Sequence, residues 1–321
     1  MSHSKRNQLY AKYCDFCSDL CTSPEGMTSN YILVTNVWNE AERIPIAFRN
    51  VSRQTKRPAA WLWMEDGSTD STYDTIIEQA GAHPDLNVIV ERMPTKAQAN
   101  FFTLGKTHEK VLRRVRERID AMGIDYMAIL DVDSEPCSNY FKRSCWILDN
   151  NPNLGAISGY IIGEWKESLV AQPMNSGKMI RWSIVREIQQ FWDFCPDTFY
   201  NIKALAQGYD VDVLHFPVHQ VRPSTNITPR GALRMGRVAY YGGRPFWAVL
   251  LRALRRALLG LHGGDMLRGY FSEWTRGTWR CDDPDVLEFF GSGRNPVGLA
   301  VEMIKQLLDE RGKRTQIVQD S

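Results

Sequence analysis

The sequence lacks the hydrophobic segments that carry a chain into or across a membrane. No stretch approaches the roughly 18 apolar residues of a transmembrane helix, and the first ten residues, MSHSKRNQLY, lack the apolar core of a signal peptide. The seven cysteines are odd in number and irregularly spaced, and a chain of 321 residues can bury a core that needs no disulfides. These absences predict a cytoplasmic protein with reduced thiols.

The charge of the chain is nearly balanced overall and strongly unbalanced locally. The net charge is +2, yet residues 221–280 contain eleven arginines, no lysine and two acidic residues, a net charge of +9. The other residues therefore sum to −7. We expect the arginine-rich segment to attract an anionic surface, such as phosphates or acidic lipid headgroups.

Three cysteines near the start have the spacing of one helix face. Cys14, Cys17 and Cys21 follow an i, i+3, i+7 pattern. Two interpretations stay open. The cysteines are either three ligands of a zinc site or small, buried thiols on one face of a helix. No fourth ligand is evident nearby, and this favours burial.

From Tyr31 onward, short apolar strands alternate with helical stretches. The hydrophobic pattern predicts strands over 31–37, 59–65, 86–91 and 125–133, and helices over 42–54, 68–81 and 98–123. Such alternation is typical of a largely parallel sheet with right-handed crossovers. Because ligands of these sheets bind beyond the carboxyl ends of the strands, the residues at those ends form the candidate site.

Carboxylates follow three of the four predicted strands. Glu40 comes shortly after the first, Asp66 directly follows the second, and Asp131 and Asp133 end the fourth. An Asp-x-Asp pair at a strand end can hold one Mg²⁺ or Mn²⁺ ion that also binds the phosphates of a substrate. Taken singly, each segment is more typical of an acidic turn or a helix cap.

In combination, these segments resemble the family 2 glycosyltransferases of GT-A fold. The resemblance covers about residues 30–225 and depends on six stretches in the family's order: TNVWNEAERI (35–44), WLWMEDGSTDST (61–72), KAQAN (96–100), YMAILDVDSEP (126–136), NPNLGAISGYI (151–161) and PDTFYNIKALAQGYDVDVLHFPVHQVRP (196–223).

The resemblance implies a fold, a domain organisation and a reaction. The fold is α/β, with a GT-A catalytic domain over 29–225, a cysteine-containing segment over 1–28 and an arginine-rich, mainly helical extension over 226–321. The reaction is inverting transfer of a sugar from a nucleotide-diphosphate sugar to a hydroxyl group of a glycan or a lipid-linked acceptor. Mn²⁺ or Mg²⁺ is the implied cofactor.

The resemblance also assigns residues to the donor and the metal. The residues expected to line the base and ribose of the donor are Thr35, Asn39, Glu40 and Asp66. Lys96 is expected to reach the diphosphate, with a solvated surface lysine as the alternative. Asp131 and Asp133 are expected to bracket the metal, with Asp131 beside the donor and Asp133 as the direct ligand. The family commonly has Asp-Asp where this chain has Glu65-Asp66, so we expect Glu65 to be structural.

An inverting transfer also needs a general base for the acceptor hydroxyl. The family places this aspartate ahead of a helix that ends in a Gly-aromatic pair, and Asp197 matches that position. Asp193 is the rival, and a helix cap is the structural alternative for Asp197. Farther along, His219 is a candidate third metal ligand and Arg222 a candidate partner of the diphosphate. An ordinary core or loop position is the alternative for His219 and for His215.

The arginine-rich tail contains an amphipathic segment, residues 245–261. Its arginines share one face and its leucines occupy most of the rest, which is the pattern of a helix lying in a membrane interface. The alternative is a helix packed on the catalytic domain. The interfacial interpretation predicts a peripheral protein at the inner face of the membrane. A last amphipathic helix over 294–314 is expected only to pack.

Three other functions compete with sugar transfer. A nucleotidyltransferase shares a similar sheet, but it would show a glycine-rich phosphate loop after the first strand, and NVWNEAERI has no glycine. A catalytically inert module that binds sugar nucleotides or membranes is opposed by Asp131, Asp133 and Asp197. Nucleic-acid binding lacks a recognisable motif in the arginine tract.

Overall fold

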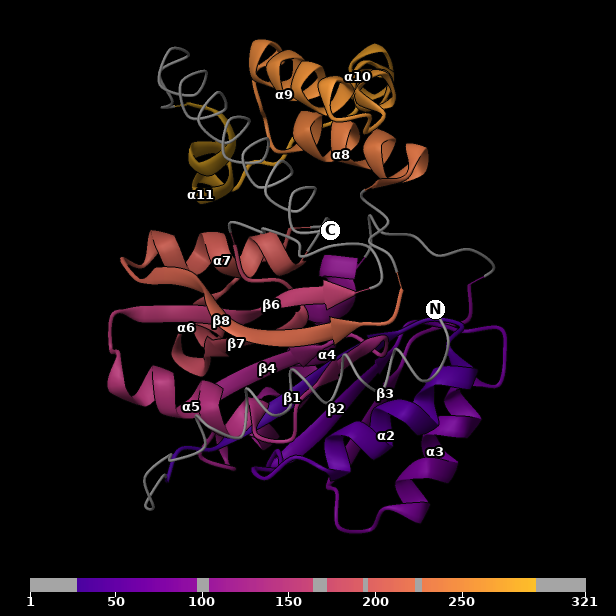
Figure 1. The fold of residues 1–321 in the computed structure, drawn as a ribbon, viewed down its shortest axis with the longest axis vertical. Coiled ribbons are helices and arrows are strands. Elements are labelled where there is room, and N and C mark those ends of the chain that lie inside the picture. Colours follow the sequence, from indigo (N-terminus) through magenta and orange to yellow (C-terminus); the bar gives the residue numbers. More distant parts are fainter. Residues whose placement is uncertain (1–27, 97–103, 164–171, 193–195, 223–226, 293–321) are drawn as a thin grey trace, which may run out of the picture. The chain divides into compact units, whose positions relative to one another are not determined.

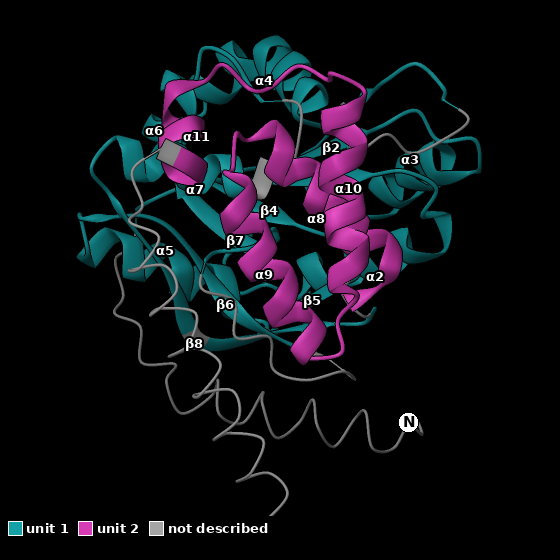
Figure 2. Ribbon diagram, turned by 90° about the horizontal axis from the view of Figure 1, so that it is seen from above, with its two compact units in different colours: residues 1–223 teal, residues 224–321 magenta. Residues whose placement is uncertain are grey.

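The computed structural model describes residues 28–96, 104–163, 172–192, 196–222 and 227–292 (Figure 1). The chain divides into two compact units, residues 1–223 and residues 224–321 (Figure 2). The three early cysteines and the predicted helix over 294–314 lie outside the described residues, so their roles stay predictions.

Unit 1 is built on a mixed sheet of eight described strands. In chain order they are β1 (Tyr31–Val37), β2 (Ala60–Glu65), β3 (Val88–Arg92), β4 (Tyr126–Leu130), β5 (Ser134–Pro136), β6 (Leu154–Gly163), β7 (Ser176–Arg181) and β8 (Asp210–Gln220). Across the sheet the order is β3-β2-β1-β4-β7-β6-β8-β5. The first four neighbours run parallel, as predicted, and β7 is antiparallel to both β4 and β6. At the far side, β8 is parallel to β6 and antiparallel to β5.

Helices cover both faces of this sheet. One face carries α2 (Ile44–Ser52), which follows the short 3-10 helix η1 (Ala41–Arg43), together with α3 (Thr72–Ala82) and α5 (Tyr140–Asn150). The other face carries α4 (Leu104–Asp120), α6 (Trp182–Glu187) and α7 (Pro196–Ala206). Because both faces are covered, every residue of β2 and of β4 is buried, and apart from the terminal Glu65 these strands are apolar without alternation.

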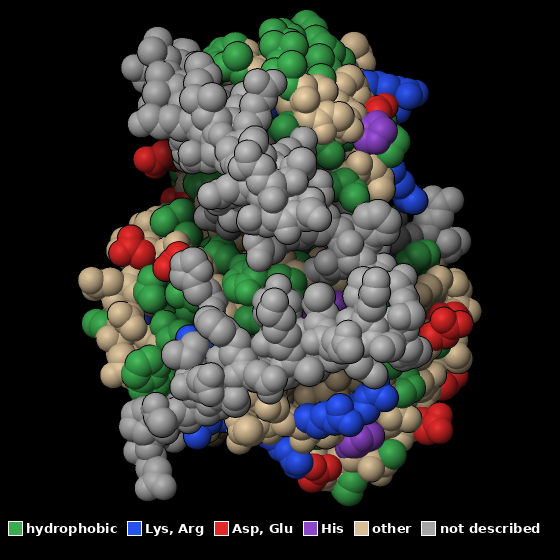
Figure 3. Space-filling view, in the orientation of Figure 1, with side chains coloured by type: hydrophobic (Ala, Val, Ile, Leu, Met, Phe, Trp, Pro, Cys, Tyr) green, Lys and Arg blue, Asp and Glu red, His purple; other side chains and the backbone are tan. Residues whose placement is uncertain are grey.

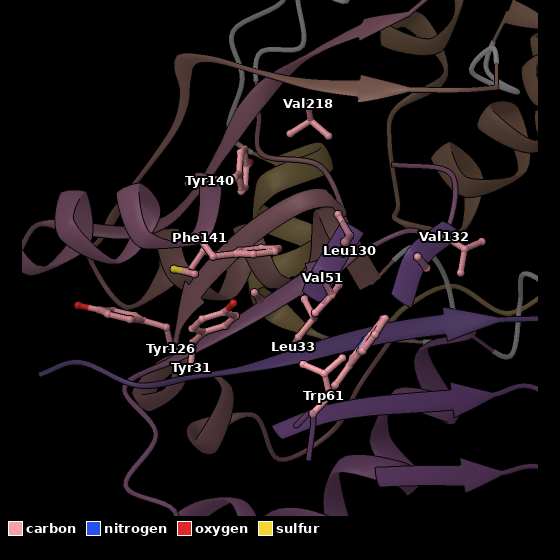
Figure 4. Close-up of a cluster of buried hydrophobic side chains, with 14 of the residues drawn as sticks. Tyr31, Leu33, Val51, Trp61, Tyr126, Leu130, Val132, Tyr140, Phe141 and Val218 are labelled. Atoms are coloured by element: carbon pink, nitrogen blue, oxygen red, sulfur yellow. The ribbon is translucent and has the colours of Figure 1, made fainter. Parts of the chain in front are cut away.

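The core on the α2 face is rich in aromatic rings. Phe48 of α2 lies 4.6 Å from the Trp61 ring and 5.5 Å from the Trp63 ring, measured between centroids. All three side chains are fully buried. Figure 4 shows part of the same cluster, around Leu33, Trp61 and Phe141. This packing fixes β1 and β2, the strands that end at the candidate site.

Of the element boundaries that differ from the sequence prediction, two concern the site. The helix predicted over 68–81 begins only at Thr72, because Asp70 Oδ1 accepts a hydrogen bond from the Thr72 N–H at 2.9 Å and the preceding residues form a turn. The strand predicted to reach Asp133 ends at Leu130, so Asp131 and Asp133 lie in the turn between β4 and β5.

Unit 2 is helical over its described residues. Its elements are α8 (Pro229–Tyr241), α9 (Phe246–Leu258), α10 (Gly263–Thr275), α11 (Pro284–Leu287) and the π-helical turn η4 (Glu288–Ser292). The amphipathic segment predicted over 245–261 corresponds to α9. A small core of Ala239, Tyr240, Val249, Met266 and Tyr270 joins α8, α9 and α10. Within the described ranges, no helix is long and apolar enough to cross a membrane.

Candidate active site

The polar residues selected from the sequence follow β1, β2 and β4 at one edge of the sheet. These strands are parallel neighbours, so their carboxyl ends lie side by side (Figure 1). The backbone continues this arrangement beyond the strands, since the Asp66 N–H donates to the Val37 carbonyl at 2.9 Å. The fold therefore brings the three carboxylate-bearing turns to a common edge.

The turns after β1 and β2 are cross-linked by hydrogen bonds. The Asn39 N–H donates to Ser68 Oγ at 2.9 Å, and Asn39 Oδ1 accepts from the Thr69 N–H at 2.8 Å. The Glu40 N–H donates to Thr72 Oγ1 at 2.8 Å. Asn39 has a left-handed backbone with φ of 53°, which asparagine tolerates better than most residues. The Asn39-Glu40 pair is thus held in a fixed orientation.

Asp66 is a buried carboxylate with two polar partners. Its side chain forms an ion pair with Lys96 Nζ, and its Oδ1 accepts from Thr107 Oγ1 at 3.0 Å. Asp66 is only 7% exposed, so a nearby positive charge is needed to offset the cost of burying it. The structure therefore joins two predicted donor-binding residues, Asp66 and Lys96, in one pair.

The neighbouring Glu65 is fully buried and turned to other partners. Its carboxylate accepts from the Ser68 N–H and lies 3.2 Å from Arg92 Nε. These contacts fix the turn that follows β2, which is the structural role expected for Glu65.

The turn after β4 presents Asp131 and Asp133. Ser176 Oγ donates to Asp131 Oδ2 at 3.4 Å. The Asp133 carbonyl accepts from the Val221 N–H at 2.9 Å, which ties this turn to the end of β8. Asp133 as a whole residue is 6% exposed.

Arg222 connects two of the carboxylate-bearing turns. Its Nε lies 2.8 Å from Asp133 Oδ2, and its Nη1 lies 2.7 Å from Glu40 Oε1. Burial lowers the pKa of the Arg222 guanidinium, but the hydrogen bonds and charges of Asp133 and then of Glu40 outweigh burial and raise it above its ordinary value. One guanidinium therefore bridges the acids that follow β1 and β4 and offsets part of their negative charge.

Two predicted residues have other partners in the structure. Thr35 is 1% exposed, and its hydroxyl accepts a hydrogen bond from Trp61 Nε1 at 2.9 Å within the core. This hydrogen bond gives Thr35 a role in packing, and its contact with the base stays a prediction. His219 lies in β8, with Nδ1 3.5 Å from Glu135 Oε2.

The predicted metal set of Asp131, Asp133 and His219 is not assembled as three ligands. Across the described ranges, no three Asp, Glu, His or Cys side chains are grouped to hold one metal ion. Asp197 belongs to the first turn of α7. Its rival Asp193 lies outside the described residues. The base assignment stays a prediction.

The sequence reasoning missed two residues that hold the acids in place. Thr107 supports Asp66 from α4, and Ser176 supports Asp131 from the first position of β7. No motif marks either residue, because a single hydroxyl in a helix or strand is common everywhere. Only the packing of α4 on the sheet and the pairing of β7 with β4 bring them to the acids.

Comparison with known proteins connects this geometry to a fold. No family model matches the sequence, and no curated protein matches it either. Among solved structures, the chain is similar to the mannosyltransferase PcManGT from Pyrobaculum calidifontis, in complex with GDP-Man and Mn²⁺. The two share 13% identity with a TM-score of 0.51, and the match covers 96% of this chain and 92% of that one.

The chain has the GT-A fold. The chain is also similar to two other solved structures, with lower TM-scores. TarS from S. aureus in complex with UDP-GlcNAc shares 14% identity over 65% of each chain, with a TM-score of 0.49. Glucosyl-3-phosphoglycerate synthase from Mycobacterium tuberculosis, with Mn²⁺, UDP-Glc and glycerol 3-phosphate, shares 11% identity with a TM-score of 0.48. That match covers 68% of this chain and 84% of that one.

The first prediction concerns Gly67, which shapes the turn after β2. Gly67 has φ of 76°, and a Cβ at this position would lie 2.1 Å from the Pro94 carbonyl oxygen. The substitution Gly67→Ala should therefore destabilise the fold by about 2–3 kcal/mol, through backbone strain and the displacement of the segment that carries Lys96. Urea unfolding measures the change.

Gly81→Ala is the matched control. Gly81 lies within α3, and nothing lies within 4 Å of a Cβ built there. Alanine at this position should stabilise the helix by about 0.5–1 kcal/mol. Equal effects of the two substitutions on the free energy of unfolding would contradict the role assigned to Gly67.

Proposed function

We propose that the chain transfers a sugar from a nucleotide-diphosphate sugar to a hydroxyl acceptor, with inversion and with the help of a divalent metal. The observation that carries the proposal is the convergence of Asp66, Asp131 and Asp133 on one edge of a GT-A sheet, with Lys96 and Arg222 among them. Acids suit the base, the ribose and a metal, whereas the two cations suit a diphosphate.

Each residue is assigned a part in donor binding. Asn39, Glu40 and Asp66 lie in the cross-linked turns after β1 and β2 and are proposed to contact the base and ribose. Lys96 and Arg222 are proposed to exchange their present carboxylate partners for donor phosphates, because phosphate oxygens offer the same charge-assisted hydrogen bonds.

The residues present fit a divalent cation. Asp133 already pairs with one cation, the Arg222 guanidinium, at 2.8 Å, and this supports a cationic partner for its carboxylate. Asp131 follows β4 directly and is the second ligand. Two carboxylates completed by donor phosphates are a common Mg²⁺ site, so the lack of a third assembled protein ligand is no obstacle. Mn²⁺ or Mg²⁺ would supply Lewis-acid neutralisation of the leaving diphosphate.

The balance of charge also calls for such a cation. Glu40, Asp66, Asp131 and Asp133 are four acids, set against the two positive charges of Lys96 and Arg222. A diphosphate adds further negative charge to a group that is already acidic. A divalent cation at Asp131 and Asp133 offsets this repulsion.

The transfer itself needs one proton acceptor. Asp197 is proposed to take the proton from the acceptor hydroxyl as its oxygen forms a bond to the anomeric carbon. The bond from that carbon to the diphosphate oxygen breaks at the same time, and the nucleoside diphosphate leaves with the bonding electrons. Attack from the face opposite the leaving group inverts the configuration at that carbon.

The first test of the function uses Asp133. The substitution Asp133→Asn should lower metal-dependent donor hydrolysis by roughly a hundredfold or more, because the leaving diphosphate loses its neutralising partner. A thermal-shift screen of nucleotide sugars identifies the donor, and release of nucleoside diphosphate is then measured with and without Mn²⁺.

Asp74→Asn is the control for Asp133→Asn, since Asp74 is an exposed acid of α3 and should leave turnover unchanged. Tight nucleotide binding by the wild type without turnover would favour an inert binding module. Turnover that does not respond to Mn²⁺ or Mg²⁺ would reject the metal assignment.

A second test uses the two rival bases. Asp197→Asn should lower the rate of transfer by about 10²- to 10⁴-fold while the affinity for the donor is kept, because only proton removal is lost. Asp193→Asn is the matched variant and should retain most of the activity. The reverse order of the two rates would assign the base role to Asp193.

A third test uses the bridge formed by Arg222. In Arg222→Gln, Asp133 loses its internal cation, so Mn²⁺ alone should bind up to about fivefold more tightly, the range expected for a half-exposed ion pair. The affinity for the donor should fall, since a phosphate partner is removed. Calorimetry with Mn²⁺ and with the nucleoside diphosphate separates the two effects. Weaker Mn²⁺ binding by the variant would contradict the idea that Arg222 competes with the metal for Asp133.

A further inference from the structure

The helices of unit 2 pack through small residues. A Cβ at Gly236 of α8 would lie 1.9 Å from the Met266 carbonyl oxygen, and one at Gly269 of α10 would lie 2.0 Å from the Leu233 carbonyl oxygen. The backbones of α8 and α10 therefore approach as closely as glycine allows. Such packing is common where helices meet inside lipid, since small residues permit close contact there.

Helix α9 also turns small residues inward. Its buried side chains are Ala248, Val249 and Ala253. The larger side chains lie on the other side of the helix, at i, i+3, i+4, i+7 and i+11 spacing: Trp247, Leu250, Leu251, Leu254 and Leu258. Leu254 is 53% exposed and Leu258 is 71% exposed. In a helix that packs against a core in water, the large apolar side chains face inward and the small ones face the solvent.

An aromatic row continues the exposed apolar surface between α9 and α10. Phe246 lies 5.1 Å from Phe271, and Phe271 lies 5.7 Å from Trp274, measured between ring centroids. Phe246 and Trp274 are both exposed. Figure 3 shows hydrophobic side chains gathered where Figure 1 labels α9 and α10. We define the outer apolar face as Phe246, Leu254, Leu258 and Trp274.

The charge of these helices is strongly positive. Residues 229–280 contain ten arginines and only two acidic residues, Asp265 and Glu273. Glu273 is buried and paired with Arg237 at 2.6 Å, so it offers little negative charge to the surface. Burial and then the charge of Arg255 lower the pKa of Arg256, which shows that the arginines of α9 repel one another. An anionic partner would relieve this repulsion.

We propose that the outer apolar face of unit 2 docks onto an anionic lipid bilayer. Its leucines and aromatic rings enter the headgroup region, and the net positive charge of residues 229–280 attracts the anionic lipid surface. Helices α9 and α10 have 13 residues each, or about 20 Å, which is shorter than the roughly 30 Å hydrocarbon core. We therefore expect these helices to lie in the interface and not to span the bilayer. This surface is independent of the proposed sugar transfer.

Vesicle sedimentation with the full chain tests the proposal. Vesicles of phosphatidylcholine alone are compared with vesicles that also contain phosphatidylglycerol, at low and high salt. The wild type should sediment with the anionic vesicles, and the double variant Leu254→Glu/Leu258→Glu should bind them at least about tenfold more weakly. Both leucines are exposed, so the variant should keep the circular dichroism of the wild type.

Two further variants separate apolar from electrostatic binding. Ile77→Glu changes an apolar side chain of α3 that is 47% exposed, and it should bind as the wild type does. Arg276→Gln, at a side chain that is 68% exposed, should weaken binding to the anionic vesicles by about fivefold and leave binding to neutral vesicles unchanged.

Three outcomes would overturn the proposal. The first is a wild type that stays in solution with anionic vesicles. The second is a double variant that binds them as tightly as the wild type. The third is a dimer in sedimentation velocity that the double variant breaks without any lipid binding, which would assign the face to a second copy of the chain.

Discussion

The site depends on one constraint, which is the electrostatic repulsion between its acidic side chains. The parallel strands β1, β2 and β4 place these acids close together at their carboxyl ends. Asp66 and Asp133 are each less than a tenth exposed, so water cannot screen them well. Lys96 offsets the first and Arg222 the second. Without these two cations, the edge could not bring its acids together before a ligand arrives.

The sequence predicted the parts of the site that depend on local pattern. Asp66 and Asp131 directly follow apolar runs that the structure confirms as β2 and β4, and the parallel order of these strands follows from the alternation with helices. The GT-A fold itself was predicted from the resemblance to the family 2 glycosyltransferases, whereas the parallel strands follow from the pattern alone. Local pattern is sufficient here because strands buried on both faces are recognisable from their apolar residues alone.

The contacts between distant segments could not be predicted. Arg222 reaches Glu40 across 182 residues, and Thr107 reaches Asp66 across 41. Each contact is set by the packing of whole elements and leaves no trace in spacing. Thr35 lies in a motif-like stretch, yet its hydroxyl is buried in the core and accepts a hydrogen bond from the indole N–H of Trp61. The motif does not reveal this core contact.

Unit 2 shows a similar division between pattern and packing. The sequence predicts that residues 245–261 form an amphipathic helix, and α9 confirms the helix. The sequence does not reveal which side of this helix faces inward, since leucines and arginines together cover most of its circumference. The structure decides this, because the side chains that α9 buries are Ala248, Val249 and Ala253.

The two outermost described strands, β3 and β5, have a consequence for how the molecule meets others. An unpaired strand edge is a template for adding a strand from another chain. Here β5 has only three residues and ends in a proline, and β3 ends in Glu91 and Arg92, which are engaged with Arg114 and Tyr73. Short length, proline and charge are the features that discourage edge-to-edge pairing. Growth of the sheet by strand addition is therefore disfavoured, and association through side-chain surfaces is left as the easier route.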